Sequence, residues 1–325
     1  MGAAHGMEER LVPAHGIPLS LIKIRGVRGK GWMQQLLAPF VILRATLAAI
    51  RVIRRLRPGV VLGMGGFVSG PGGLAAWLCR RPLIIHEQNA LPGVTNRLLA
   101  HLASRVLCAY PEAFSPDAKV HVTGNPVRQE IVAIPDSAAR PVHTGPVRVL
   151  VLGGSLGARS LNRAVPEALA GFAGLSRLEI LHQTGEQDAA AVTARYRELA
   201  CEARVVPFIA GMAEAYAWAD CVICRAGALT LAEICAVGLP SVLVPFPHAV
   251  DDHQTLNARH LSDNAAAVLL RDSELSPETL VAALRPLIQD PVHRQAMAAR
   301  ARALGKPRAT ADVVQHCLEL MPRAA

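Results

Sequence analysis

Short apolar runs alternate with amphipathic segments along most of this chain. The clearest runs are 60–62, 83–85, 105–109, 147–152 and 221–224. Each is bounded by Gly, Pro or charged positions, as is typical of strands buried on both faces of a parallel sheet. The segments between them repeat apolar residues at helical spacing. The pattern therefore predicts an α/β protein made of strand–turn–helix units.

The pattern starts again after residue 146, which predicts two domains. With 325 residues the chain exceeds the size of one ordinary core. The segment 135–146 contains three Pro and no apolar period, so we interpret it as a linker between domains 1–134 and 147–308. At the start, Met1 leads directly into a predicted helix at 7–13 and a strand at 17–24, without an opening strand.

A long helix, 32–57, carries two apolar stripes. One stripe is Leu36, Phe40, Leu43, Leu47 and Ile50, and the other is Ile42, Ala49, Ile53 and Leu56. Two interpretations stay open. The helix packs on two sides, or one stripe forms an exposed patch beside Arg44, Arg51, Arg54 and Arg55 and rests on anionic lipid.

The stretch 219–257 predicts a ligand site. A buried strand, 221–224, is followed by a turn, a helix carrying Glu233, a second buried strand and a polar loop with Asp251, Asp252 and Gln254. The carboxyl ends of parallel strands meet at one edge, where ligands of open α/β sheets bind, and a helix N-terminus favours an anion. The alternative is a solvated Glu beside an ordinary polar loop.

Two further turns have the composition of binding sites. The turn 63–73 holds six Gly, which suits a phosphate cradle or a tight strand-to-helix turn. Four hydrogen-bonding residues, His86 to Asn89, stand at the end of the run 83–85, where unused polar groups would be costly.

The composition limits the classes of molecule that we expect this protein to bind. The net charge of +9 favours an anionic partner such as a phosphate or a membrane surface. Aromatic residues are 4% of the chain and no nucleic-acid-binding motif occurs, so we expect no nucleic acid. The seven Cys are scattered in apolar runs, and we interpret Cys221 and Cys224 as core residues rather than a redox or metal pair. We expect no cofactor and no metal.

Six motifs occur in order: GMGGFVSGPGG, HEQN, GNPVR, GGSLGAR, RAGALTLAE and PFPHAVDDHQTLNA. Together they closely resemble the MurG family of peptidoglycan glycosyltransferases, over essentially the whole chain. The resemblance implies a GT-B fold, with two Rossmann-like, doubly wound domains facing across a cleft. It also implies transfer of N-acetylglucosamine from UDP-N-acetylglucosamine to lipid I, an undecaprenyl-diphosphate-linked muramoyl-pentapeptide. The expected location is the cytoplasmic face of the bacterial inner membrane, as a peripheral protein that can meet cell-wall and division proteins.

The resemblance also implies roles for individual residues. The donor-binding residues would be Asn89, Arg128, Ser155, Ile209, Ala228, Leu229, Thr230, Leu231, Ala232, Glu233 and Gln254. Among them, Ser155 would hold the diphosphate, Ile209 would meet uracil and Glu233 the ribose hydroxyls. The acceptor loop would include Gly65, Gly66, Ser69 and Gly70. The last helix, 309–320, would cross back onto the first domain.

One departure concerns the first domain. Members of the family open with a strand and a GGTGGH-type turn, whose His is the favoured general base, and this sequence does not contain that segment. The resemblance therefore implies an N-terminally truncated first domain with a gap in its sheet, and we consider His86 as a substitute base. An alternative to the enzyme is an impaired form that binds UDP-sugar and serves as a membrane or division-complex module. A related glycolipid synthase or epimerase is a weaker alternative.

Overall fold

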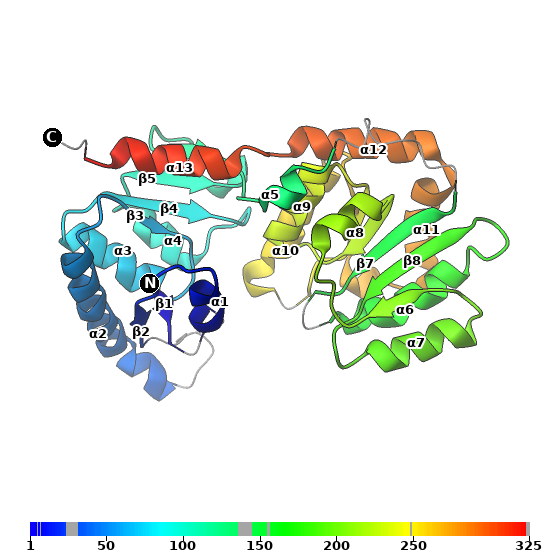
Figure 1. Cartoon of the computed structure of the whole chain (residues 1–325), viewed down its shortest axis with the longest axis horizontal. Coiled ribbons are helices and arrows are strands. Elements are labelled where there is room, and N and C mark those ends of the chain that lie inside the picture. The colour runs from blue at the N-terminus through cyan, green and yellow to red at the C-terminus, as the bar shows by residue number, and fades with distance from the viewer. Residues whose placement is uncertain are drawn as a thin grey trace. The chain divides into compact units, whose positions relative to one another are not determined.

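The structure is a computed structural model that describes residues 1–4, 6, 8–23, 32–135, 145–154, 157–247 and 249–322, without the side chains of 32–38 and 250. It divides into two compact units (Figure 1). Unit 1 comprises Met1–Thr123 and Ala311–Ala325, and unit 2 comprises Gly124–Thr310.

The described strands of unit 1 form two parallel sheets. The larger has the order β3 (Val61–Gly63), β4 (Leu83–Glu87), β5 (Arg105–Cys108) and β6 (Val120–Val122). Among the described residues, β1 (Gly2–Ala3) and β2 (Leu21–Ile22) pair with each other as a separate sheet. The predicted strand at 17–24 is thus a two-residue strand. The short strand at Gly2 was not predicted, because two residues carry no readable period.

Unit 1 also contains the following described helices. They are α1 (Glu8–Ala14), α2 (Trp32–Leu56), α3 (Ser69–Leu78), α4 (Val94–Ala100), the short η1 (Pro111–Ala113) and α13 (Ala309–Leu320). Ala45, Ala49 and Ile53 of α2 are buried against Ala75 and Ala76 of α3. Small side chains at this contact let the two helices approach closely.

Only one face of α2 is buried. Phe40, Leu43 and Leu47 are exposed, whereas Ala49 and Ile53 belong to the core. Neither predicted stripe matches the buried face completely. Ala49 and Ile53 of the second stripe are buried, but Ile42 and Leu56 are exposed, and Ile50 of the first stripe packs against the same core. The side chain of Leu36 lies outside the description.

Helix α13 packs on the sheet of unit 1 from Ala311 onward (Figure 1). Val313 is buried with Ile84 and Leu107 in a small apolar cluster. Arg105 of β5 donates to Glu319 and contacts His316 Nδ1 at 2.7 Å. The end of the chain is thus fixed to unit 1 by both apolar and charged contacts.

Unit 2 has one parallel sheet with the strand order β12-β11-β10-β7-β8-β9. The strands are β7 (Val147–Leu152), β8 (Leu178–Gln183), β9 (Arg204–Val206), β10 (Cys221–Cys224), β11 (Ser241–Leu243) and β12 (Val268–Leu269). Its helices are α5 (Gln129–Val132), α6 (Arg159–Ala170), α7 (Ala189–Glu198), α8 (Met212–Trp218), α9 (Ala228–Val237), α10 (His253–Ser262), α11 (Pro277–Gln289) and α12 (Pro291–Leu304), with the short η3 (Val250–Asp252) and η4 (Asp272–Glu274).

Local signals set the limits of several helices in unit 2. Helix α9 ends at Gly238, which adopts a left-handed φ of 72°. Helix α11 begins with a capping box between Ser276 and Thr279, and α12 is capped by Asp290. Helix α9 is the predicted helix that carries Glu233 between two buried strands. Cys221 and Cys224 are buried in β10 as predicted, and burial raises the pKa of each thiol to about 12.

The segment 124–134 packs in unit 2. Ile131 and Ile134 are buried in the core that also contains Tyr216 and Ile234. The predicted boundary after residue 134 therefore moves to between Thr123 and Gly124. The helix α5 is too short for its burial to be read from the sequence. Most of the predicted linker, residues 136–144, lies outside the described part of the chain.

Candidate functional site

The carboxyl ends of three strands of unit 2 lie in register. Cys224 pairs with Leu152 of β7 and with Leu243 of β11. The turns that follow these strands therefore meet at one edge of the sheet. They carry Gly153 and Gly154, then Arg225 to Gly227, then Val244 to Phe246. This is the edge at which the sequence predicts a ligand site.

Two buried asparagines hold the N-terminal turn of α9. Asn257 Nδ2 donates to Ala226 O at 3.3 Å, and Asn125 Nδ2 donates to Ala228 O at 3.4 Å. Both donors come from segments distant in the sequence. The first N–H groups of a helix have no partner within the helix, so a fixed α9 start can present them to an anion.

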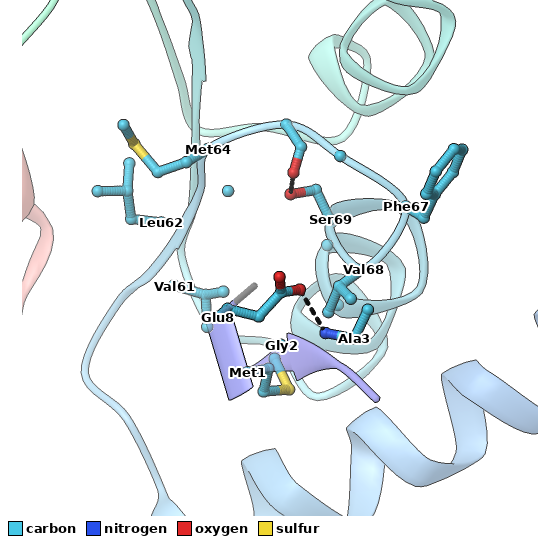
Figure 2. A pocket seen from close by; sticks show the side chains of 15 residues that line it. Met1, Gly2, Ala3, Glu8, Val61, Leu62, Met64, Phe67, Val68 and Ser69 are labelled. Atoms are coloured by element: carbon cyan, nitrogen blue, oxygen red, sulfur yellow. Dashed lines mark hydrogen bonds between the residues drawn. The ribbon is translucent and has the colours of Figure 1, made fainter. Parts of the chain in front are cut away.

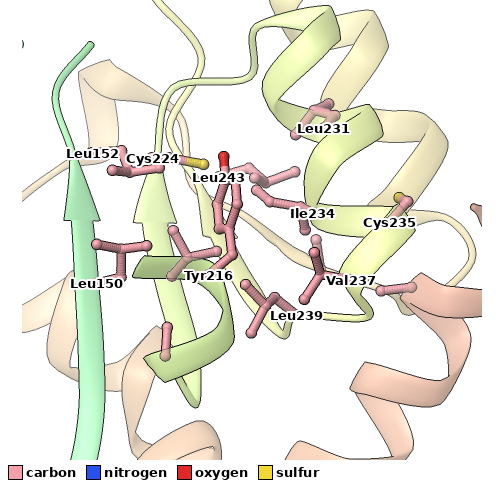
Figure 3. Packing of buried hydrophobic residues seen from close by; sticks show 14 of the residues in the cluster. Leu150, Leu152, Tyr216, Cys224, Leu231, Ile234, Cys235, Val237, Leu239 and Leu243 are labelled. Carbon is pink, nitrogen blue, oxygen red and sulfur yellow. The ribbon is translucent and has the colours of Figure 1, made fainter. Parts of the chain in front are cut away.

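The predicted donor-binding run Ala228 to Glu233 divides between surface and core. Leu229 is exposed, while Ala228, Thr230 and Ala232 are half-buried. Leu231 is 1% exposed and packs in the apolar core (Figure 3). Its side chain is therefore unavailable to a ligand, and its backbone N–H already donates to Gly227 O at 3.0 Å, so Leu231 serves the packing of α9.

The carboxylate of Glu233 has two fixed neighbours. Tyr216 of α8 donates its hydroxyl to Glu233 Oε2 at 3.0 Å, and Arg128 Nη2 donates to Glu233 Oε1 at 3.1 Å. The Glu233 side chain is 16% exposed. Such a carboxylate can still accept from hydroxyl groups, because each oxygen has two lone pairs. Tyr216 was not among the predicted site residues, and its place in an ordinary apolar helix gave no signal.

Arg225 joins four segments at the same edge. Its Nη1 donates to Val244 O and Pro245 O, both at 3.1 Å, and to Asp272 Oδ1 at 2.6 Å. Its Nη2 donates to Ser160 Oγ at 2.8 Å. The sequence pattern assigned Arg225 only to a turn. A lone Arg directly after a buried strand was the signal that could have suggested this role.

Gln254 lies at the start of α10, where Asp251 and Asp252 adopt left-handed backbone angles. Its Oε1 accepts from Phe246 N at 2.9 Å. This bond joins the loop after β11 to α10 and fixes the orientation of the Gln254 side-chain amide. Among the described residues, no group of three His, Cys, Asp or Glu side chains could hold a metal ion.

Ser155 lies outside the described residues, but its flanking glycines are defined. Gly154 and Gly157 have φ of +77°. A Cβ on Gly157 would lie 2.4 Å from Thr184 O, and one on Gly153 would lie 3.0 Å from Gln183 O. These glycines therefore let the turn after β7 pack against the end of β8.

Ile209 follows β9 and is 9% exposed. It lines a groove of about 880 Å³ over β8 and β9, together with Leu181, Arg204, Phe208 and Trp218. Phe208 is exposed, so the groove has an aromatic wall. A flat heterocycle could pack there, with the backbone near Ile209 as its hydrogen-bonding partner.

Glu87 organises the polar end of β4 in unit 1. This buried carboxylate accepts from Asn89 N at 3.0 Å, Gly93 N at 3.1 Å and Asn96 Nδ2 at 2.8 Å. Asn89 Nδ2 also lies 3.4 Å from Glu87 Oε1. Many hydrogen bonds of the four polar residues at this strand end thus join them to one another and to the loop that follows. These pairings could not be predicted from the sequence.

His86, the substitute base of the sequence analysis, is fully buried in unit 1. Its Nδ1 lies 3.3 Å from Gln88 Nε2, and its carbonyl accepts from Asn96 Nδ2. The imidazole has no exposed surface from which to take a proton from a substrate hydroxyl in this conformation. Strand geometry explains the burial, because side chains alternate along β4 and His86 is on the same face as Ile84, which is buried with Val313 of α13.

The glycine-rich turn of unit 1 has two functions in the fold. Gly65 and Gly66 adopt φ of +81° and +77°, and Ser69 donates its hydroxyl to Gly65 O. A Cβ on Gly73 would lie 2.8 Å from Leu99, so this glycine serves helix packing. Gly70 lies beside Thr95. The first part of the turn suits a ligand loop, and the second part suits packing of α3 on α4.

A pocket of about 390 Å³ separates β1 from β3 (Figure 2). Met1, Gly2 and Ala3 line one side, and Val61 and Leu62 line another. Glu8 Oε1 accepts from Ala3 N at 2.8 Å, and Figure 2 shows this bond within the pocket. Among the described residues, this pocket lies between strands that belong to the two separate sheets of unit 1.

Comparison with known proteins identifies the family. The N-terminal domain model of glycosyltransferase family 28 matches residues 1–108, and its C-terminal domain model matches residues 148–313. Two curated relatives are named UDP-N-acetylglucosamine--N-acetylmuramyl-(pentapeptide) pyrophosphoryl-undecaprenol N-acetylglucosamine transferase. The protein from Marinobacter nauticus is 51% identical to this chain, and the protein from Stutzerimonas stutzeri is 52% identical. Each alignment covers 98% of this chain, with 88% and 89% of the relative. The chain belongs to the MurG family.

Solved structures agree with membership in the MurG family. The crystal structure of Acinetobacter baumannii MurG is 41% identical, with a TM-score of 0.84 over 98% of this chain and 89% of that one. A putative UDP-N-acetylglucosamine 2-epimerase from Listeria monocytogenes is 15% identical with a TM-score of 0.67, covering 97% and 87%, and shares the fold alone. The predicted GT-B fold, with two Rossmann-like domains, is confirmed.

Proposed function

We propose that this MurG-family protein transfers N-acetylglucosamine from UDP-N-acetylglucosamine to undecaprenyl-diphospho-N-acetylmuramoyl-pentapeptide, with inversion at the sugar carbon. The observation that carries the proposal is identity of 51–52% over 98% of the chain to proteins bearing that name. The six motifs that resemble the family all lie within the aligned length.

The donor would bind at the carboxyl edge of the unit 2 sheet. Glu233 would accept from the ribose hydroxyls, Ile209 would meet uracil through its backbone, and Gln254 would contact the sugar. The support is physical. Glu233 is a largely buried acceptor, Ile209 lines an aromatic-walled groove, and Gln254 is fixed by its bond to Phe246. Ser155 and Arg128 would complete the donor site within unit 2.

The leaving UDP would be stabilised by backbone N–H groups. The start of α9 is held by Asn125 and Asn257, and the turn after β7 contains glycines in left-handed conformations. Fixed donors aimed at developing negative charge lower the barrier without reorganisation during the reaction. Gly65, Gly66, Ser69 and Gly70 would face the diphosphate of the acceptor. We assign no general base to His86, because it is fully buried.

The protein would act at an anionic membrane surface, on the cytoplasmic face of the inner membrane. Phe40, Leu43 and Leu47 form an exposed apolar face on α2, with exposed Arg44 and Arg51 beside them. An apolar face flanked by Arg suits the interface of anionic lipid. Among the helices that the structure describes, none is long and apolar enough to cross a bilayer.

The test is transfer of labelled N-acetylglucosamine from UDP-N-acetylglucosamine to a lipid I analogue, with A. baumannii MurG as the positive control. We expect a labelled lipid II product that is lost when Glu233 is changed to Gln. Absence of product, while UDP still binds, would reject the transferase proposal for this chain.

A second candidate is a UDP-sugar-binding module that docks on membrane or division proteins without turnover. The observation that favours it is the division of the unit 1 sheet by a pocket. UDP binding and vesicle binding in the absence of transfer would support this candidate.

A further inference from the structure

We propose that Tyr216 is a positioning residue that fixes the Glu233 carboxylate for recognition of the ribose 2′-hydroxyl of the nucleotide. This rests on the proposed function, in which Glu233 accepts from the ribose of a UDP-sugar. Tyr216 belongs to α8, outside every motif that carries the family resemblance. Its role follows from the contacts of one hydroxyl group.

The ring of Tyr216 cannot move easily. It is 1% exposed and stands among Leu150, Ile234 and Leu239 in the core of unit 2 (Figure 3). Close-packed interiors hold side chains in single rotamers. The hydroxyl at the end of the ring is therefore a fixed point, and its bond of 3.0 Å fixes Glu233 Oε2 in turn.

The hydroxyl is a donor at every physiological pH. Burial raises the pKa of Tyr216 well above its ordinary value, and the nearby carboxylate of Glu233 raises it further. An ionised carboxylate can only accept, so a neutral phenol is its complement.

The two oxygens of Glu233 have different neighbours. Oε2 is held from the core by Tyr216, while Oε1 bonds Arg128, whose side chain is 48% exposed. Arg128 also lies 3.4 Å from Glu130, so it has a second carboxylate to bond. The exposed side of Oε1 can therefore gain a ribose hydroxyl while the core side of the carboxylate stays fixed.

Removal of the Tyr216 hydroxyl releases Oε2. The carboxylate can then rotate and take both nitrogens of Arg128 in a bidentate pair, which occupies both oxygens. A site built to bond a hydroxyl discriminates strongly against analogues that lack it. Loss of the fixed geometry should therefore reduce discrimination between UDP and 2′-deoxy-UDP, as well as affinity.

The experiment measures binding of UDP and 2′-deoxy-UDP to the full chain by calorimetry. For Tyr216→Phe we expect the Kd of UDP to rise about tenfold, equivalent to about 1.4 kcal/mol, and the Kd of 2′-deoxy-UDP to change less than threefold, roughly 0.6 kcal/mol. Tyr196→Phe is the matched control, because Tyr196 is a buried tyrosine of unit 2 whose hydroxyl bonds His182 instead. It should lose the same atom without changing either Kd.

A double-mutant cycle with Glu233→Gln separates positioning from general packing. If Tyr216 acts through Glu233, Tyr216→Phe should add less than about twofold to the loss already caused by Glu233→Gln. Additive losses, or an unchanged ratio of the two Kd values in Tyr216→Phe, would overturn the proposal. An unchanged Kd for UDP in Glu233→Gln would instead reject the placement of the ribose at Glu233. Circular dichroism confirms that each variant is folded.

Discussion

Arg128 and Glu233 lie 105 positions apart in the sequence and form an ion pair with 3.1 Å between Nη2 and Oε1. The pair joins the segment 124–134 to α9, within unit 2. Arg128 precedes α5, whose Ile131 is buried in the same unit. The motif GNPVR therefore belongs to unit 2 in the fold, although it follows β6 of unit 1 in the sequence.

Changing Arg128 to Gln should impair the donor site more than the fold. Partly exposed ion pairs contribute about 0–1 kcal/mol to stability, so the urea midpoint should barely change. We expect the KM for UDP-N-acetylglucosamine to rise about tenfold, equivalent to about 1.4 kcal/mol. Arg148→Gln is the control, because Arg148 forms a comparable pair with Glu179 at 3.4 Å. Equal KM values in the two variants would contradict the assignment.

Changing Glu87 to Gln should disturb the loop after β4. The carboxylate accepts from three N–H groups within 3.1 Å, and the new amide would turn a donor toward one of them. We expect unit 1 to lose about 1–3 kcal/mol of unfolding free energy, measured by chemical denaturation. Calorimetric binding of UDP should change little. The exposed Glu112→Gln should leave stability within about 0.5 kcal/mol, as surface changes usually do.

Replacing Leu43 and Leu47 by Asp should release the protein from anionic vesicles. Both side chains are exposed on α2, so the substitution removes apolar area without opening the core. Flotation with phosphatidylglycerol-containing vesicles measures the effect. The control replaces two exposed apolar residues of unit 2, Leu175 and Val292, and should still float. Equal loss of binding in both variants would show that added charge alone is responsible. Unfolding of the first variant would show that the face is packed.

The stability of unit 2 should fall as the pH falls below about 6.5. His182 is fully buried, and burial lowers its pKa from the ordinary value of about 6.5 to about 3. Asn162 Nδ2 donates to Thr184 O, so its Oδ1 accepts from His182 Nε2 at 3.2 Å, and Tyr196 donates to Nδ1 at 3.1 Å. The neutral ring is therefore fully bonded.

Between these pKa values the unfolded chain binds a proton that the folded chain does not. The free energy of unfolding should therefore decrease by about 1.4 kcal/mol per pH unit from about pH 6.5 towards 3, and His182 contributes full stability only above that range. Urea unfolding from pH 7.5 to 5 measures the slope. His182→Gln should reduce it, whereas His293→Gln should not. An equal slope in His182→Gln would contradict the account.

Periodic features of the chain were predictable from the sequence, and contacts between distant segments were not. The limits of α9 follow from Ala228 and Gly238, and the burial of Cys221 and Cys224 follows from their apolar run. The bond of Tyr216 to Glu233 joins two helices, and no local pattern encodes it. The burial of His86 depends on which layer covers its strand. The role of Arg225 depends on four segments that meet only in the fold.

The pocket between β1 and β3 also bears on the dynamics of unit 1. Two-residue strands form marginal ladders on their own. Within the described residues the β1–β2 pair is anchored by Ile22, which packs on Ala45 and Ala49, rather than by bonds to the larger sheet. This pair should therefore open by local unfolding at lower free energy than β4 and β5, and its amides should exchange with deuterium first. Cooperative protection of the unit 1 amides from exchange would then begin at β3, and the β1–β2 pair would unfold separately from the larger sheet.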